Sequence, residues 1–220
     1  MSRRERQRAQ TREEAKQIAL RQLASAGPSA LSLNAIAGEI GITGPGLYRY
    51  FAGRDELLAT LTLDAYQDLA DHLEAAAIQA WRRSLRMRMH AVAHAYRAWA
   101  LAQPHRYNLL YAEPIAGYPV QARQITTAAQ RAFAVVIDGI GVALGDHPAA
   151  PEPRALNSQL IRWAGRSGFG QTPAATMLAG LHWWSRIHGF ITLEIAGNFA
   201  ATGIDLDLLY DNEIDHLLGP

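Results

Sequence analysis

The sequence contains no cysteine, and several features of secreted, membrane and catalytic proteins are also missing from it. Without cysteine there can be neither a disulfide framework nor a thiolate metal site, which suits a reducing compartment. No stretch approaches the roughly 18 uninterrupted apolar residues of a membrane span. The longest candidate, Ala132 to Leu144, is interrupted by Asp138 and two glycines. The arginines near the N-terminus have no apolar run behind them, so we expect no signal peptide and a cytoplasmic protein.

Positive charge is concentrated at the beginning of the chain. The sequence has 220 residues, 49% of them hydrophobic, which is enough to bury a substantial core in two modules of unequal size. Residues 1–60 hold nine Lys/Arg and six Asp/Glu, a net charge of +3, whereas residues 61–220 hold twelve and fourteen, a net charge of −2. We interpret residues 1–10 as a flexible basic arm that contacts DNA phosphate or a minor groove, although a charged leader can also serve solubility.

Residues 32–58 have the layout of two short helices joined by a tight turn and followed by a longer helix. Ser32 can cap the first helix, and apolar residues then recur at spacings of three and four until Gly41, which can end the helix. Thr43 can cap the second helix, and Pro45 stands in the first turn, where its missing N–H has no helical partner. This is the layout of a DNA-reading helix-turn-helix.

The spacing also predicts which side chains of the second short helix face inward and which face outward. Leu47, Tyr50 and Phe51 fall on one side and are predicted to pack inward. The remaining residues of this segment are free to face a partner, namely Gly44, Pro45, Gly46, Tyr48 and Arg49.

The rest of the chain has helical periodicity punctuated by proline and glycine, without an alternating strand pattern. We expect the clearest breaks around residues 113–119 and at a loop over residues 143–153. The predicted helices cover residues 54–80, 82–103, 106–112, 120–144, 153–167, 173–200 and 205–217.

The last two predicted helices carry apolar residues at heptad spacing, which favours packing against a partner helix. Ordinary packing in the protein's own core would give the same periodicity. The first seam consists of Met177, Leu181, Trp184, His188, Ile191, Ile195 and Asn198, and the second stripe of Leu206, Tyr210, Ile214 and Leu217.

Aromatic and polarisable side chains gather in the helices predicted for the middle of the chain. Such side chains could line a cavity for a small, largely hydrophobic effector, although aromatics at helical spacing also fill cores. The candidate effector-binding residues are Met87, His90, His94, Trp99, Tyr107, Tyr111, Phe133 and Trp163.

Catalytic motifs are not found. His90 and His94 have the spacing of two metal ligands on one helix face, but no Glu follows His90 and no third ligand is identifiable, so packing or pocket histidines are favoured. The run Gly165-Arg166-Ser167-Gly168 lacks the spacing of a nucleophile elbow. We therefore expect no enzyme, no metal and no cofactor.

The run from Thr43 to Leu57 resembles the DNA-binding head of the TetR family of bacterial regulators. The resemblance rests on Leu47-Tyr48-Arg49-Tyr50-Phe51 and Arg54-Asp55-Glu56-Leu57, and it covers residues 11–60. The sequence departs from the family at Asn34-Ala35, where a charged pair is common, and at Gly44-Pro45-Gly46, which offers almost no side chain. Upstream, the positions that are similar to the family's first helix and its stop are Ala15, Ala19, Leu20, Leu23, Ala24 and Gly27.

The resemblance implies an all-α protein with a three-helix helix-turn-helix head over residues 11–53. A long helix joins this head to an α-helical bundle over residues 54–220 that binds effector and dimerises. The implied function is a homodimeric repressor that binds double-stranded operator DNA and is released by a small effector. The residues expected to contact DNA are Ser32, Thr43, Gly44, Pro45, Gly46, Tyr48, Arg49 and Arg54. The residues expected at the dimer interface are Leu181, Trp184, His188, Ile191, Ile195, Leu206, Tyr210 and Ile214.

Two other functions stay open at this point. An all-α small-molecule-binding protein could carry the same three helices for packing only, without sequence-specific DNA binding. A nucleoid or RNA-binding protein is disfavoured by the near-neutral net charge of +1.

Overall fold

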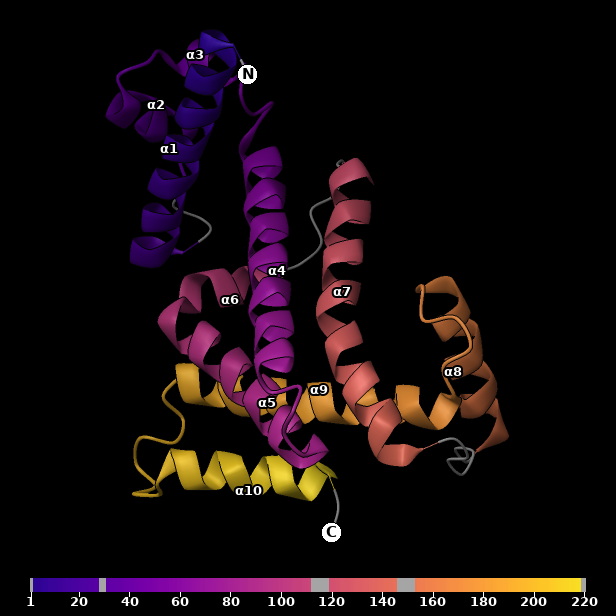
Figure 1. Ribbon diagram of the computed structural model, residues 1–220. Coiled ribbons are helices and arrows are strands. Elements are labelled where there is room, and N and C mark those ends of the chain that lie inside the picture. The colour runs from indigo at the N-terminus through magenta and orange to yellow at the C-terminus, as the bar shows by residue number, and fades with distance from the viewer. Residues whose placement is uncertain (1, 28–30, 112–118, 146–152, 219–220) are drawn as a thin grey trace. The chain divides into compact units, whose positions relative to one another are not determined.

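The computed structural model describes residues 2–27, 31–111, 119–145 and 153–218, and these segments contain ten α-helices and no β-strand (Figure 1). The all-α prediction is therefore confirmed. The predicted breaks over residues 113–119 and 143–153 lie largely outside the described residues. The helices are α1 (Arg3–Ala26), α2 (Leu33–Ile40), α3 (Gly44–Leu47), α4 (Arg54–Gln79), α5 (Leu85–Ala102), α6 (Pro104–Leu110), α7 (Pro119–Leu144), α8 (Arg154–Arg166), α9 (Ala174–Ile195) and α10 (Leu206–Leu218).

The chain divides into two compact units. Unit 1 comprises residues 1–66 and 103–126, and unit 2 comprises residues 67–102 and 127–220. The expected boundary between residues 53 and 54 therefore falls inside unit 1. The reason is that Leu58 and Leu61 of α4 and Leu109 of α6 belong to the same hydrophobic cluster as the first three helices.

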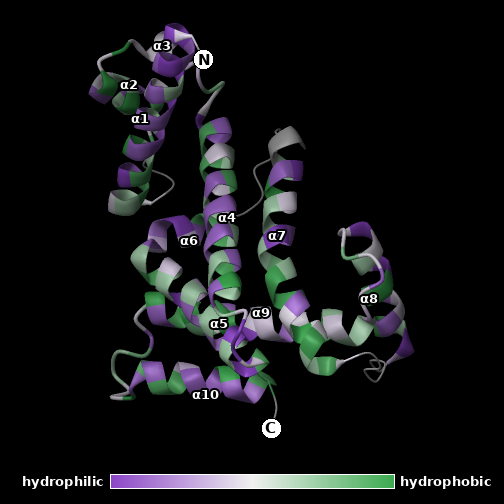
Figure 2. Cartoon of the chain, in the orientation of Figure 1, coloured by the Kyte–Doolittle hydropathy of each residue, from purple (hydrophilic) through white to green (hydrophobic). Residues whose placement is uncertain are grey.

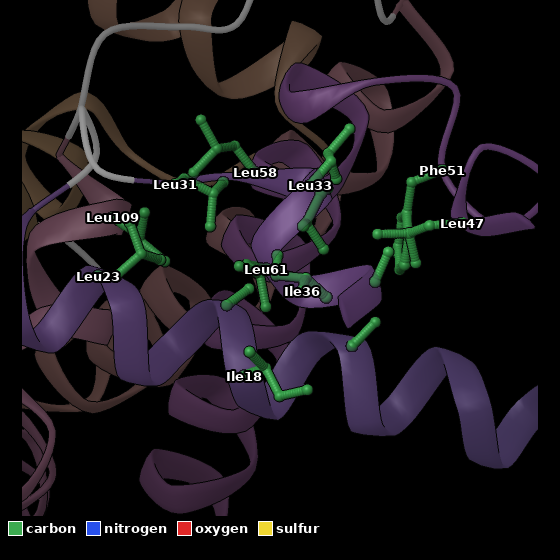
Figure 3. Close-up of a cluster of buried hydrophobic side chains, with 14 residues drawn as sticks. Ile18, Leu23, Leu31, Leu33, Ile36, Leu47, Phe51, Leu58, Leu61 and Leu109 are labelled. Carbon is green, nitrogen blue, oxygen red and sulfur yellow. The ribbon is translucent and has the colours of Figure 1, made fainter. Parts of the chain in front are cut away.

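The core of unit 1 is an aliphatic cluster contributed by α1, α2, α3, α4 and α6 (Figure 3). Ile18 from α1, Ile36 from α2 and Leu47 from α3 are almost completely buried, and Phe51 fills the space after α3. Burying one such side chain contributes roughly 1.5–3 kcal/mol, so this cluster supplies most of what fixes the first three helices against one another.

The predicted caps of α2 and α3 are present. The Ser32 hydroxyl accepts a hydrogen bond from the Ala35 N–H at 3.3 Å, and the Thr43 hydroxyl accepts one from the Gly46 N–H at 3.2 Å. Gly41 ends α2 at a φ of 80°, a left-handed conformation that costs glycine little. The turn between the two helices therefore follows from residues that the sequence identifies.

The predicted flexible basic arm over residues 1–10 is wrong, because residues 3–10 are the first turns of α1. Ser2 and Glu5 form a capping box: the Ser2 hydroxyl accepts from the Glu5 N–H at 3.2 Å, and the Glu5 carboxylate accepts from the Ser2 N–H at 2.6 Å. This pairing satisfies N–H groups that a helix start would otherwise leave exposed. The arginines of this segment are thus held on a helix.

Unit 2 buries larger and more polar side chains than unit 1. Trp183, Tyr96 and Tyr210 are fully buried, and the Tyr210 hydroxyl donates to the Ala93 carbonyl at 2.8 Å. Arg97 is 9% exposed and links three helices, because its guanidinium lies on the two Glu194 carboxylate oxygens at 2.7 Å and on Asp207 at 2.6 Å. These contacts fasten α5 to α9 and α10.

One helix, α9, ends earlier than the sequence predicts. Helix α9 ends at Ile195, five residues before the predicted end at residue 200, because the chain adopts a positive φ of 75° at Gly197.

Within the described residues, one helix segment, Ala122–Leu144 of α7, is long and apolar enough to cross a membrane by length and composition alone. Core helices of soluble proteins also pass this test.

Candidate nucleic-acid interface and ligand pocket

The second short helix of unit 1 presents the side chains that the sequence predicted. Leu47 and Phe51 are fully buried, whereas Tyr48 is 53% exposed and Pro45 and Arg49 are exposed as well. Tyr50 is half-buried and packs against the core of unit 1. The outward set therefore forms one accessible surface, which is the geometry of a recognition helix that enters a groove.

The glycine at the start of α3 has a packing role that the sequence did not reveal. A Cβ atom at Gly44 would lie 2.8 Å from the Asn34 side-chain oxygen, so the absence of a side chain lets α2 and α3 approach closely. Gly44 is half-buried, and it reaches the surface less than Pro45 does. Its neighbour Gly46 is held by the Thr43 cap.

Arginines from the first turns of α1 surround the end of the helix-turn-helix. Arg8 donates to the Arg49 carbonyl at 3.2 Å, and Arg12 donates to the Tyr50 carbonyl at 2.7 Å while its guanidinium lies 4.4 Å from the centre of the Phe51 ring. These contacts hold α1 against residues 49–51, which follow α3. A groove of about 280 Å³ opens beside them, and it is lined by Arg4, Gln7, Arg8, Arg49 and Tyr50. Three guanidinium groups at one groove favour an anionic partner.

The remaining predicted DNA-contact residues stand at helix starts. Ser32 is exposed at the start of α2, and its own N–H donates to the Gln22 side chain at 2.9 Å. Arg54 is the first residue of α4 and is exposed. Backbone N–H groups and a positive dipole end favour phosphate at such positions.

An apolar pocket of about 490 Å³ lies in unit 2 between the second part of α4, α5 and α7. Its apolar wall includes Ile78 and Trp81, whose side chains are largely exposed although they are hydrophobic. Polar groups border this wall, and the Arg88 guanidinium lies 5.0 Å from the centre of the Trp81 ring. The full lining consists of Glu74, Ala77, Ile78, Trp81, Arg88, Met89, Val92, Val135, Asp138 and Gly139.

None of the eight predicted effector residues lines this pocket. Met87 is exposed, Trp99 is buried with its indole N–H donating to Asp68 at 2.8 Å, and the Phe133 and Trp163 rings pack together 5.8 Å apart. Tyr107 and Tyr111 belong to unit 1, where their rings lie 5.1 Å apart. His90 and His94 point to acidic residues of α10.

The residues that line the pocket are less conspicuous in the sequence than the aromatic residues and histidines that were predicted. On α5, Met89 follows the predicted Met87 by two positions and Val92 follows the predicted His90 by two, and Ile78 and Trp81 are apolar residues near the end of α4. Which face of α5 meets α4 and α7 is decided by contacts between distant segments. The predicted residues of α5 therefore lie on a different face of this helix from the residues that line the pocket.

The predicted dimer seam is only partly available to a partner. Ile191, Tyr210 and Ile214 are fully buried within the single chain, so assigning them to an intersubunit surface was wrong. Gly180 of α9 also packs within the chain, because a Cβ atom there would clash with the Ile137 side chain of α7. The other residues expected at the dimer interface are exposed or half-buried, namely Leu181, Trp184, His188, Ile195 and Leu206.

A capped helix-turn-helix with a basic groove beside an exposed recognition segment defines a helical DNA-binding regulator, and comparison with known proteins identifies the family. The family model for bacterial regulatory proteins of the tetR family matches residues 17–61, and the model for tetracyclin repressor-like C-terminal domains matches residues 89–217. The chain belongs to the TetR family and is a DNA-binding transcriptional regulator. Regulators of this family are generally not enzymes.

Individual relatives agree with this assignment. The chain is 35% identical over 192 residues to the helix-turn-helix transcriptional regulators Mb1846 of Mycobacterium bovis and Rv1816 of Mycobacterium tuberculosis, with 84% of this chain and 80% of each relative covered. It is 41% identical to a protein described as a regulator, SCO4313, whose crystal structure matches over 100% of both chains with a TM-score of 0.81. The fatty acid degradation regulator FadR from Bacillus halodurans shares the fold, with 14% identity, a TM-score of 0.61 and coverage of 94% of this chain and 97% of that protein.

Proposed function

We propose that this regulator is a cytoplasmic homodimeric repressor without enzymatic activity, and that a small, largely hydrophobic effector releases it from a palindromic operator. The observation that carries the proposal is the exposed surface of Pro45, Tyr48 and Arg49 beside the arginine-lined groove of unit 1. Such a surface has no role in the core of unit 1, and its charge and shape suit a DNA groove.

The DNA contacts divide into positioning and base-reading roles. Tyr48 is expected to donate a hydrogen bond to a phosphate, and Ser32 and Arg54 to clamp phosphates at the starts of their helices. Pro45 is suited to apolar contact with a thymine methyl group, while Thr43 can reach a phosphate or a base edge. Gly44 and Gly46 keep this end of α3 free of bulky side chains, and Arg49 adds positive charge.

Dimerisation follows from the geometry of DNA reading. One helix-turn-helix covers only a few base pairs, whereas two heads about 34 Å apart fill successive major grooves. The accessible residues of α9 and α10 suit the partner contact, with Leu181, Trp184 and His188 on α9 at its centre. The buried residues of these helices, Ile191, Tyr210 and Ile214, pack in the core of the subunit and do not contact the partner.

The pocket of unit 2 is the site that we propose for the effector. Its wall is mostly apolar, which suits a hydrophobic molecule, and Glu74, Arg88 and Asp138 offer a few polar anchors. Ala77 and Ile78 belong to α4, the helix that begins with Arg54. A ligand that prefers one position of this helix would change the spacing of two recognition helices, and a few kcal/mol of differential affinity suffice for such a switch.

Capture of genomic DNA tests the proposal. Purified full-length protein is mixed with sheared genomic fragments, and the retained fragments are sequenced. We expect a palindromic motif whose half-sites lie one helical turn apart or a multiple of it. Fragments without a common palindromic motif would contradict the proposed palindromic operator.

A further inference from the structure

Two histidines of α5 and an aspartate of α10 converge at one point of unit 2. His94 Nε2 lies 2.7 Å from Asp211 Oδ1, and His90 Nδ1 lies 3.4 Å from the same oxygen. One ligand atom from each of the three side chains lies within 4.8 Å of the others. The sequence offered only the histidine pair, and the third ligand that it lacked comes from a helix 117 residues further along the chain.

A second aspartate fixes the orientation of the first histidine. His90 Nε2 lies 2.7 Å from Asp215 Oδ1, and Arg86 donates to that same oxygen at 2.5 Å. Because Nε2 contacts Asp215, the other ring nitrogen of His90, Nδ1, faces Asp211. A carboxylate that holds the far nitrogen of a histidine is the usual outer partner of a metal-bound imidazole.

The buried side chain of Tyr210 packs against the cluster, which is otherwise open to solvent. The buried Tyr210 ring meets the His94 ring edge-on with centroids 5.4 Å apart, and its hydroxyl is tied to the Ala93 carbonyl. The side chains of His90, His94 and Asp211 are 24%, 43% and 46% exposed, respectively. An ion can therefore enter from solvent and keep one or more water molecules.

The charge of the region favours a cation at this point. No lysine or arginine follows Arg186 in the sequence, and α10 carries Asp207, Asp211 and Asp215. Two arginines of α5 are paired with other carboxylates: Arg86 with Asp215, and Arg97 with Glu194 and Asp207. Asp211 is therefore the carboxylate that has two imidazoles as its contacts.

We propose that His90, His94 and Asp211 bind a divalent transition-metal ion of the zinc class, with solvent completing the coordination and Asp215 acting as a positioning residue. Two imidazoles and a carboxylate are a ligand set that Zn²⁺ accepts, with bonds of about 2.0–2.2 Å. Bound in this way, the ion ties α5 to α10 and stabilises unit 2. The site is separate from the DNA-contacting surface and from the apolar pocket, and it goes beyond the proposed repressor function.

Titration with Co²⁺ and Zn²⁺ tests the proposal on the full-length chain without an affinity tag, after treatment with a chelator. We expect one Co²⁺ per chain with the visible absorption of a low-symmetry site, and displacement of Co²⁺ by one Zn²⁺. His94→Asn and Asp211→Asn should abolish this absorption, while Asp215→Asn should weaken Zn²⁺ binding by about 10–100-fold. Binding should also weaken in acid, because the ligands must lose protons.

The matched control is His72→Asn, which removes an exposed histidine of α4 that contacts the Asp68 carbonyl and lies outside the cluster. It should bind as the unaltered chain does. Circular dichroism in the presence of chelator checks that each variant is folded, and His94→Gln replaces any variant that is not. A chain that binds neither ion, or whose binding survives both His94→Asn and Asp211→Asn, would overturn the proposal. Neither readout depends on DNA.

Discussion

The two compact units bury different kinds of side chain. The hydrophobic cluster of unit 1 consists of alanine, isoleucine and leucine with one aromatic residue, Phe51, and Tyr107 is also buried in this unit. Unit 2 buries Trp183, Tyr96 and Tyr210, and it also encloses Arg97 between acidic partners. In unit 2, therefore, directional contacts add to the hydrophobic effect, whereas unit 1 depends mainly on burial of apolar area.

This difference matches the roles that we propose for the two units. A recognition surface must be held rigidly while its outer residues stay free, and an aliphatic core does this without polar groups that need partners. A unit that responds to a ligand benefits from polar contacts between distant helices, because such contacts have a small number of discrete arrangements. Helix α10 of unit 2 carries both hydrophilic and hydrophobic residues along its length (Figure 2), so it can make polar as well as apolar contacts.

The strongest test of the contrast is removal of the one aromatic ring in the hydrophobic cluster of unit 1. Phe51→Ala leaves a cavity in a fully buried site and should lower the free energy of unfolding by about 3–5 kcal/mol. Tyr48→Ala, three residues away and exposed, should change it by less than about 0.5 kcal/mol. Urea unfolding followed by circular dichroism measures both. Equal losses in the two variants would contradict the burial assigned to these residues.

The next largest effect is expected in the ion-pair cluster of unit 2. Arg97→Met leaves the Glu194 carboxylate, only 11% exposed, without its guanidinium and should cost about 3 kcal/mol. Arg186→Met removes a pair with Glu213 in which the arginine is half-exposed, and this should cost less than about 1 kcal/mol. The same unfolding experiment separates them. If the Arg97 variant were as stable as the Arg186 variant, polar contacts would not distinguish unit 2.

A smaller effect should follow from filling the pocket. Val135→Trp places an indole in the cavity and should weaken binding of the apolar probe anilinonaphthalene sulfonate by at least about tenfold, or ~1.4 kcal/mol. Ala143→Trp adds the same ring at an exposed position of α7 that does not line the pocket. Fluorescence titration compares the two variants. Loss of probe binding in both, or in neither, would remove the pocket assignment.

The smallest expected effect is the pH dependence of stability, to which each unit contributes one histidine. Burial lowers the pKa of His188 in unit 2, and burial together with the Arg106 charge lowers that of His105 in unit 1, both from 6.5. Below pH 6.5 the unfolded chain takes up protons that the folded chain does not, so stability is present above this pH and is lost as the pH falls.

Unfolding in the presence of chelator over pH 5–7.5 measures this loss. His188→Gln and His105→Gln should each flatten the curve, and the exposed His72→Gln should not. A curve that keeps its slope in both variants would exclude these histidines as its cause.

The helix-turn-helix was predictable from the sequence because its determinants are local. Ser32, Gly41 and Thr43 act within a few residues of their own positions, and the spacing of Leu47 and Phe51 fixes which face of α3 is buried. The start of α1 was missed because the density of arginines was taken as a sign of flexibility, although the Ser2 and Glu5 capping box was present in the sequence.

The sites of unit 2 could not be predicted with the same accuracy. A periodic apolar stripe marks burial but does not say whether the partner is the chain itself or a second subunit, and Tyr210 and Ile214 proved to face their own core. The contact between His94 and Asp211 spans 117 residues, and no spacing rule relates them. Contacts of this kind become visible only when the helices are packed together.

The central claim is that the surface around Tyr48 contacts DNA, and the salt dependence of operator affinity tests it most directly. Fluorescence anisotropy with a captured palindromic fragment, at several salt concentrations, compares the unaltered chain with Tyr48→Ala, Arg54→Ala and Arg162→Ala, the last at an exposed position of α8. We predict that Tyr48→Ala and Arg54→Ala each weaken binding and reduce the slope of log affinity against log salt by about one unit, while Arg162→Ala leaves both unchanged. Unchanged affinity and slope in both the Tyr48 and Arg54 variants would contradict the account.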